Sequence, residues 1–231
     1  MALKKSLILM AVTAFFALPG RFVRADDLQN VLKELDASAA KFHATTADFE
    51  FDSYVTEPIP DKQVMTGTAY YQRKGSTFSM AAHVKQQDGN NLPKTYMFTG
   101  GRLQLFDPGI DQITIINRAT QFESYIMLGF GASGTELADK WTIKDDGPET
   151  LNNIKTEKLE LVAKDPTVRK TIAKVTVWLD TSRAVSLKQI FDLGNGASRV
   201  CTYSNINVNP PSLPADAFKF KTDGKTTTVT Q

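Results

Sequence analysis

The sequence has few of the residues that metal sites and disulfides require. Its 231 residues include one cysteine and two histidines. Cys201 excludes an internal disulfide, and its place on a predicted strand favours a buried structural thiol over a reactive one. Neither His43 nor His83 has a second ligand at the spacing of a zinc site. We therefore predict no metal and no cofactor.

Motifs of enzymes are equally scarce. The chain has no G-x-S-x-G nucleophile motif, and Asp111, Asp145 and Asp146 are predicted as solvated acids in turns. Residues 129–134 spell G-x-G-x-x-G, but no buried parallel strand precedes them, so we interpret the segment as a flexible connector and not as a nucleotide site. The sequence predicts that the protein is not an enzyme. An esterase-type hydrolase stays open as an alternative, because catalytic triads are assembled in space.

No apolar run is long enough to cross a bilayer as a helix, which needs roughly 20 residues. Residues 6–18 are apolar, follow a short basic start and precede the small residue Ala25, a pattern typical of a cleavable signal peptide. We predict cleavage after Ala25 and a periplasmic protein. Loss of Lys4, Lys5, Arg21 and Arg24 leaves 23 basic against 25 acidic residues. No basic block remains, so nucleic acid is excluded as a partner.

The mature chain, residues 26–231, has no Pro/Ser-rich linker and no repeat, and it predicts a single domain. A helix opens it, with one apolar stripe at helical spacing: Leu28, Val31, Leu32, Leu35, Ala39 and Phe42. Some ten strands follow, including residues 47–56, 112–116, 218–220 and 226–229. Short turns join them, so we expect one antiparallel sheet that curls strongly.

The segment that organises the chain is a hairpin, residues 67–84, with a turn at Gly75. Tyr71 on its first strand and Phe78 and Met80 on its second belong to one apolar face, because side chains alternate along a strand. Arg73 ends that face. It is either a surface arginine at a turn or a cation at the edge of an apolar concavity that holds a cover shut.

Residues 117–141 interrupt the strands. They lack alternation and carry large apolar side chains at roughly helical spacing, among them Phe122, Tyr125, Ile126 and Leu128. We predict a helical insert with glycines at positions 129, 131 and 134. Two interpretations stay open: the insert is permanent core, or it is a glycine-hinged lid over an apolar pocket.

The mature chain resembles the LolA-like proteins, the periplasmic carriers of outer-membrane lipoproteins. The resemblance follows the order of the motifs, from the helix ending in Lys41-Phe-His-Ala to the hairpin Gly67-Thr-Ala-Tyr-Tyr-Gln-Arg73. It continues through Gly100-Gly-Arg-Leu-Gln-Leu-Phe-Asp-Pro108 and the C-terminal strands. The family often has proline after the arginine, whereas Lys74 stands here.

The resemblance implies an α+β fold: an incomplete, half-open antiparallel β-barrel covered by the N-terminal helix and the helical lid insert. It implies a monomer that carries lipoprotein acyl chains from the inner to the outer membrane, with an inner-membrane releasing complex and an outer-membrane acceptor as partners. It assigns lid gating to Arg73. The residues predicted to line the acyl-binding cavity are Phe51, Tyr71, Phe78, Met80, Tyr96, Phe98 and Leu105. An envelope sensor or a general lipid-binding protein on the same scaffold is the alternative.

Overall fold

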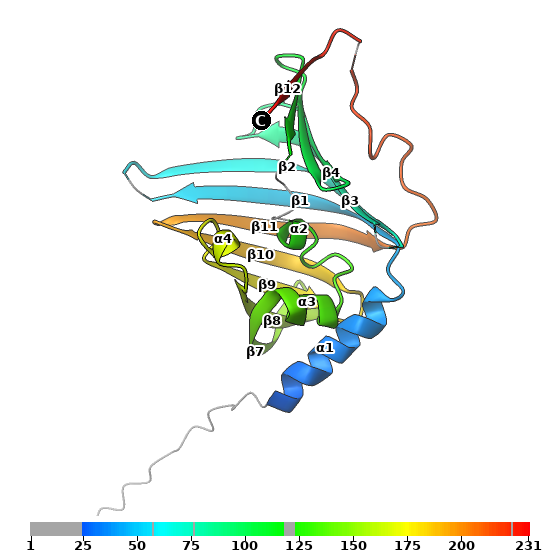
Figure 1. Cartoon of the computed structure of the whole chain (residues 1–231), viewed down its shortest axis with the longest axis vertical. Coiled ribbons are helices and arrows are strands. Elements are labelled where there is room, and N and C mark those ends of the chain that lie inside the picture. Colours follow the sequence, from blue (N-terminus) through cyan, green and yellow to red (C-terminus); the bar gives the residue numbers. More distant parts are fainter. Residues whose placement is uncertain (1–24, 57, 76, 118–122, 223) are drawn as a thin grey trace, which may run out of the picture.

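The computed structural model describes residues 25–56, 58–75, 77–117, 123–222 and 224–231. Twelve strands form one curved sheet in the order β12-β6-β5-β4-β3-β2-β1-β11-β10-β9-β8-β7 (Figure 1). Its first half consists of β1 (Ala44–Val55), β2 (Asp61–Lys74), β3 (Thr77–Gln87), β4 (Lys94–Thr99), β5 (Arg102–Asp107) and β6 (Gln112–Ile116). Its second half consists of β7 (Trp141–Leu151), β8 (Ile154–Ala163), β9 (Lys174–Asp180), β10 (Val185–Gly194) and β11 (Ala197–Val208). The predicted half-open barrel is confirmed.

The edge strand β12 (Thr227–Thr230) departs from the expected pattern. It pairs parallel with β6, whereas the other ladders are antiparallel. The parallel pairing is possible because residues 209–222 form a long connection across the outer face of the sheet. There His83 Nε2 lies 3.0 Å from the carbonyl oxygen of Ala217, and the Phe106 and Phe220 rings contact each other. The strand predicted at 218–220 is therefore wrong: the segment makes turns and covers outward-facing side chains.

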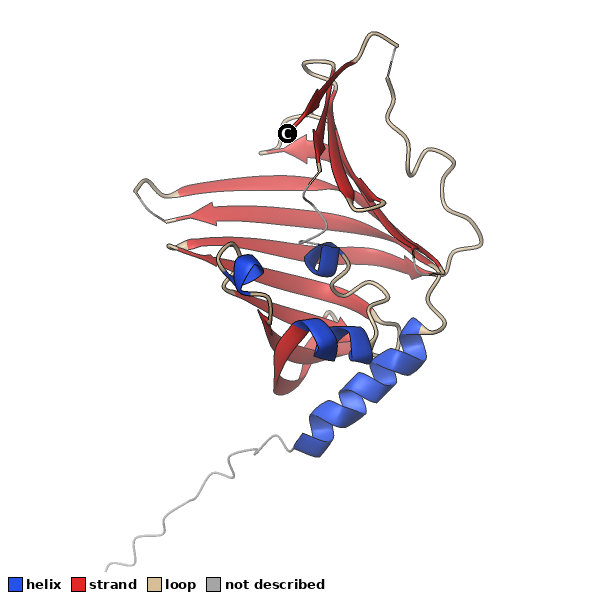
Figure 2. Cartoon of the chain, viewed as in Figure 1, coloured by secondary structure: helices blue, strands red, loops and turns tan. Residues whose placement is uncertain are grey.

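The helices of the described residues lie on the concave face of the sheet (Figure 2). They are α1 (Ala25–Ala39), α2 (Glu123–Ile126), α3 (Gly134–Lys140) and α4 (Pro166–Arg169). The predicted stripe of α1 is confirmed: Leu32 and Leu35 are buried, and Leu28, Val31 and Ala39 pack against the core. No helix in the described ranges has the length and apolar character needed to span a membrane.

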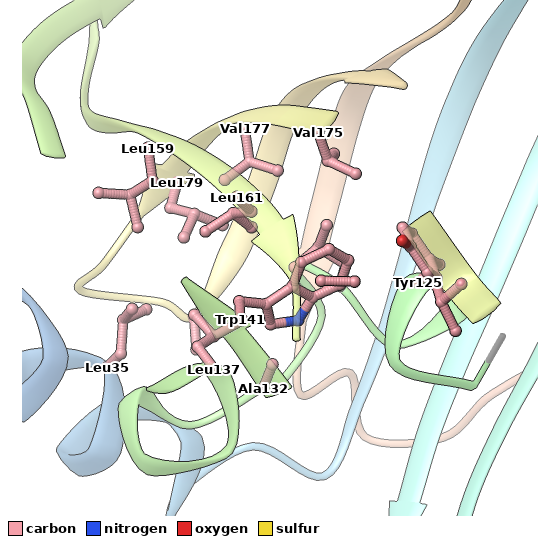
Figure 3. Close-up of a cluster of buried hydrophobic side chains, with 14 residues drawn as sticks. Leu35, Tyr125, Ala132, Leu137, Trp141, Leu159, Leu161, Val175, Val177 and Leu179 are labelled. Carbon is pink, nitrogen blue, oxygen red and sulfur yellow. The ribbon is translucent and has the colours of Figure 1, made fainter. Parts of the chain in front are cut away.

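The main core fills the concave face of β7 to β10. Trp141 packs beside Leu137 and Ala132 and faces Leu161 from the sheet (Figure 3). Tyr125 from α2 meets the Trp141 ring edge-on, with 4.6 Å between ring centroids. Each helix contributes at least one side chain to this cluster, which fixes all four against one half of the sheet.

Strand β7 was not expected from the sequence. Asp145 and Asp146, predicted as solvated turn acids, lie on this strand, and Asp145 is buried beside a bulge in the ladder with β8. The Asp145 carboxylate accepts a hydrogen bond from the backbone N–H of Gly147 at 2.8 Å. Gly147 and Pro148 interrupt the alternation from which a strand would be predicted. Inside a strand, glycine and proline are typical of bulges and edges.

Candidate functional site

The concave face of the first half of the sheet borders an apolar cavity of about 550 Å³ that is partly open to solvent. Strands β1 to β6 form one wall, β10 and β11 form the other, and α2 and the segment after α4 close over it. The lining residues are Phe49, Phe51, Met65, Ala69, Tyr71, Met80, Ala82, Val84, Tyr96, Leu103, Ile116, Tyr125, Ile126, Thr171, Ile172, Gln189, Phe191, Leu193, Arg199, Cys201 and Tyr203. Such a volume lies within the usual range for a small-molecule site, ~300–1,000 Å³.

The seven residues predicted as cavity lining share the concave face, but they divide into three groups. Phe51, Tyr71, Met80 and Tyr96 line the cavity. Phe78 and Phe98 are buried in the hydrophobic cluster next to it and do not line it. Leu105 lies opposite Tyr96 in the β4–β5 ladder and is likewise absent from the cavity wall. Alternation along the strands thus gives the face of each residue but not its distance from the cavity.

Sequence reasoning missed the second wall of the cavity. Phe191 and Leu193 on β10, with Arg199 and Tyr203 on β11, line the cavity beside the residues of β1 and β2 on the same concave face. They reach the cavity because β11 pairs with β1, so that Arg199 lies opposite Ser53 and Cys201 opposite Phe51. The alternation of Arg199, Cys201 and Tyr203 was visible in the sequence, but nothing in the sequence indicated which strand would be their neighbour.

Polar groups in the cavity wall bond to one another. The Tyr71 and Tyr203 hydroxyls lie 3.2 Å apart, and the Tyr203 hydroxyl donates to the Gln189 side-chain oxygen at 3.4 Å. The Gln189 side-chain nitrogen donates to the Leu128 carbonyl. Burial raises the pKa of Tyr71 and of Tyr203 well above the usual range, so both phenols stay neutral. This chain of hydrogen bonds ties the insert to the sheet and leaves the cavity apolar.

The first part of the insert covers the cavity directly. Tyr125 and Ile126 on α2 line it, whereas Leu128 is buried in the neighbouring core clusters. Phe122, the fourth predicted lid residue, lies outside the described residues. Two of the predicted lid residues are therefore in contact with the cavity.

The second part of the insert is closely packed, which corrects the prediction of a flexible connector at residues 129–134. Phe130 is fully buried and stacks on Tyr71, with 3.8 Å between ring centroids and an interplanar angle of 3°. The Gly131 N–H donates to the Ala184 carbonyl at 2.9 Å. A Cβ at Gly131 would lie 2.3 Å from the Phe42 ring, and one at Gly134 would lie 2.1 Å from the Leu32 carbonyl oxygen. These glycines permit close approach of the backbone.

Arg73 links the sheet to this packed part of the insert. Its guanidinium donates two hydrogen bonds to the Glu136 carboxylate, at 3.0 and 3.2 Å. Glu136 also accepts from the backbone N–H of Ser133 and completes a capping box at the start of α3. Burial pushes the pKa of Glu136 upward, but the hydrogen bonds from Arg73 and Ser133 outweigh it and the net pKa is lowered. The backbone N–H and the hydroxyl of Thr135 donate hydrogen bonds to the Asp36 carboxylate of α1.

The wall of the cavity includes one thiol, that of Cys201. Burial raises the pKa of Cys201 to about 12, so the thiol is protonated at neutral pH and a poor nucleophile. Neither histidine lines the cavity, and His83 lies on the outer face against Ala217. The described residues include no group of three or more His, Cys, Asp or Glu side chains placed to hold a metal ion.

No protein-family model matches the chain, and no curated protein sequence does. Solved structures do match it. An uncharacterized conserved protein from Thermus thermophilus is similar over 88% of this chain and 98% of its own, with a TM-score of 0.54 and 10% identity. MucB is similar over 85% of this chain and 63% of its own, with a TM-score of 0.52 and 11% identity.

The matching structures also include a LolA superfamily protein from Nitrosomonas europaea. It is 14% identical over 84% of this chain and 97% of its own, with a TM-score of 0.40. MucB has also been solved in complex with MucA(peri). At these identities the two stronger matches establish a shared fold.

Proposed function

We propose that this protein is a periplasmic carrier that binds the acyl chains of lipoproteins reversibly and shuttles them from the inner to the outer membrane. The observation that carries the proposal is the apolar cavity between the half-open barrel and the helical insert, whose walls present no reactive nucleophile. Transfer of an acyl chain from water into such a site contributes about 0.8 kcal/mol per methylene group. Binding of this kind needs no chemical step.

The insert supplies the elements of a gate in this proposal. Tyr125 and Ile126 lie over the cavity, and Arg73 holds the next helix through Glu136. Rupture of the Arg73–Glu136 pair would loosen the insert and admit or release the acyl chain. An inner-membrane releasing complex and an outer-membrane acceptor would supply the lipoprotein and receive it. Cleavage of a signal peptide after Ala25 would deliver the protein to that compartment.

Native mass spectrometry of the mature protein, purified from a bacterial periplasm, tests the proposal. We expect co-purified acylated species in the wild type and their loss in Met80→Asp, which places a charge in the cavity wall. Ser79→Asp is the matched control, because Ser79 is the neighbouring residue on the same strand and points to the opposite face. A clean apo mass, together with no uptake of an acylated peptide, would contradict the carrier function.

A second candidate is a module that binds a partner protein in the envelope. The shared fold with MucB, which has been solved with MucA(peri), supports it. The fully buried Phe130 also supports it, because the protein's own side chain fills part of the concave face. Under this hypothesis the cavity would remain empty in the same mass-spectrometry experiment.

A further inference from the structure

One cation lines the otherwise apolar cavity. Arg199 projects from the same face of β11 as Cys201 and Tyr203, and among the residues that line the cavity it is the only Lys, Arg or His. The other polar side chains of the wall belong to the hydrogen-bonded chain at Tyr71 or, like Thr171, carry no charge. A charged group in such surroundings is costly unless something offsets its lost hydration.

The guanidinium of Arg199 has spare hydrogen-bonding capacity. It donates to the Ser53 hydroxyl, and within the described part of the chain it makes no ion pair and no other side-chain hydrogen bond. An arginine has five N–H donors in a planar fork that matches the two oxygens of a carboxylate. By contrast, Arg73 at the other end of the concave face is already paired with Glu136.

The cavity therefore has two different ends. Tyr71, stacked on Phe130, lies opposite Thr45 of β1, whereas Arg199 lies opposite Ser53, eight residues further along the same strand. Eight residues of strand span ~27 Å. The Tyr71 end is closed by aromatic rings, and the Arg199 end lies near the β1–β2 loop and the β10–β11 turn. This polarity matches a molecule with an apolar tail and an anionic head.

The volume of the cavity is sufficient for one long acyl chain. Its 550 Å³ lies within the usual range of ~300–1,000 Å³ for small-molecule sites. A methylene group occupies about the same space as a water molecule, whose share of the liquid is ~30 Å³.

We infer that the cavity binds the single chain of a long-chain fatty acid, with its tail towards Phe130 and its carboxylate on Arg199. The inference rests on the proposed binding of acyl chains in this cavity and concerns a free fatty acid, which has the carboxylate that a lipoprotein-linked acyl chain lacks. Ser53 would hold the guanidinium in place while the remaining N–H donors receive the ligand.

Calorimetric titration of the full mature protein with lauric acid and lauryl alcohol tests this inference, since the two ligands share a chain and differ in head group. We expect the wild type to bind lauric acid at least about tenfold more tightly, a difference of about 1.4 kcal/mol. Arg199→Met should bind both ligands alike, with its affinity for the alcohol unchanged. Arg199→Lys should keep part of the preference for lauric acid that Arg199→Met loses, because lysine keeps the positive charge but lacks the paired N–H donors of a guanidinium.

The control variant is Arg102→Met, which removes an exposed arginine on the outward face of β5 and should change neither affinity. Equal affinities in the wild type, or a preference that survives in Arg199→Met, would overturn the inference. Binding of an acylated peptide without binding of lauric acid would overturn it and leave the proposed carrier intact. If lauric acid, lauryl alcohol and the acylated peptide all failed to bind, the fatty-acid inference and the proposed carrier function would both be overturned.

Discussion

The two halves of the sheet differ in what covers their concave faces. Over β7 to β10, side chains of the four helices pack into a continuous core around Trp141 and Leu161. Over β1 to β6, Phe130 fills one end and the remaining space is the cavity. Both halves carry alternating apolar residues, mainly aromatic over β1 to β4 and mainly Leu and Val over β8 and β9. The comparison shows that the helices fill one half of the concave face and leave part of the other half open.

The largest expected effect is on the free energy of unfolding, when one large apolar side chain in each half of the sheet is replaced by alanine. Leu161→Ala should cost about 2–5 kcal/mol, because it removes a fully buried side chain from a filled core. Met80→Ala should cost less than half as much, because Met80 already borders open space and has fewer partner atoms to lose. Urea denaturation of both variants measures the difference. Equal costs would mean that the cavity is not hollow in solution.

A second substitution tests whether the insert is packed or hinged. In Gly134→Ala the new Cβ would meet the backbone carbonyl of Leu32, which cannot rotate away, so we expect a loss of roughly 1–3 kcal/mol. Gly109→Ala is the control, since its only close contact is the Asp107 side chain. Thermal unfolding gives both values. A neutral Gly134→Ala would indicate that α1 and α3 separate readily.

A third substitution tests the link between the halves. Arg73→Leu removes the pair with Glu136, which is partly exposed, so its effect on global stability should be only about 0.2–1 kcal/mol. Its effect on motion should be larger: hydrogen exchange over residues 123–140 should speed up, and bound acyl ligand should dissociate faster. Lys144→Met, which removes an exposed pair with Asp146, should leave both unchanged. Unchanged exchange and release in Arg73→Leu would remove Arg73 from the gate.

A pH-dependent effect is expected in the filled half. Burial raises the pKa of Glu157 from 4.5 to about 7, and the neighbouring Asp145 contributes to this rise. The charge of Lys155 lowers the pKa of Glu157, and Asp27 raises it by a smaller amount. The folded state therefore holds this proton more tightly than the unfolded chain does. Its stabilising contribution is complete at low pH and is lost as pH rises from about 4.5 to 7.

Glu157→Gln should flatten that part of the stability curve, measured by denaturation at a series of pH values. Lys155→Met is the companion variant. It removes the charge that opposes the shift, so its stability should fall with pH over a wider range than in the wild type. A pH dependence in Glu157→Gln identical to that of the wild type would contradict the assignment.

Much of the fold was predictable from local patterns. The α1 stripe, the hairpin at 67–84 and β6 all follow from periodicity and turn residues, and the faces of Phe51, Tyr71 and Met80 follow from alternation. The prediction failed where context overrides local signals. Gly147 and Pro148 concealed β7, and the apolar residues at 218–220 cover the outer face of the sheet although they resemble a strand.

The sequence by itself determined that one face of each strand is apolar and that a helical insert interrupts the strands. It also placed Arg73 at the end of the apolar face of the hairpin. Only the tertiary structure decided that β11 lies beside β1, that Arg73 meets Glu136, and that Arg199 enters the cavity. The physical reason is that side-chain alternation is a local property of the backbone, whereas strand neighbours and unfilled space depend on how the whole chain packs.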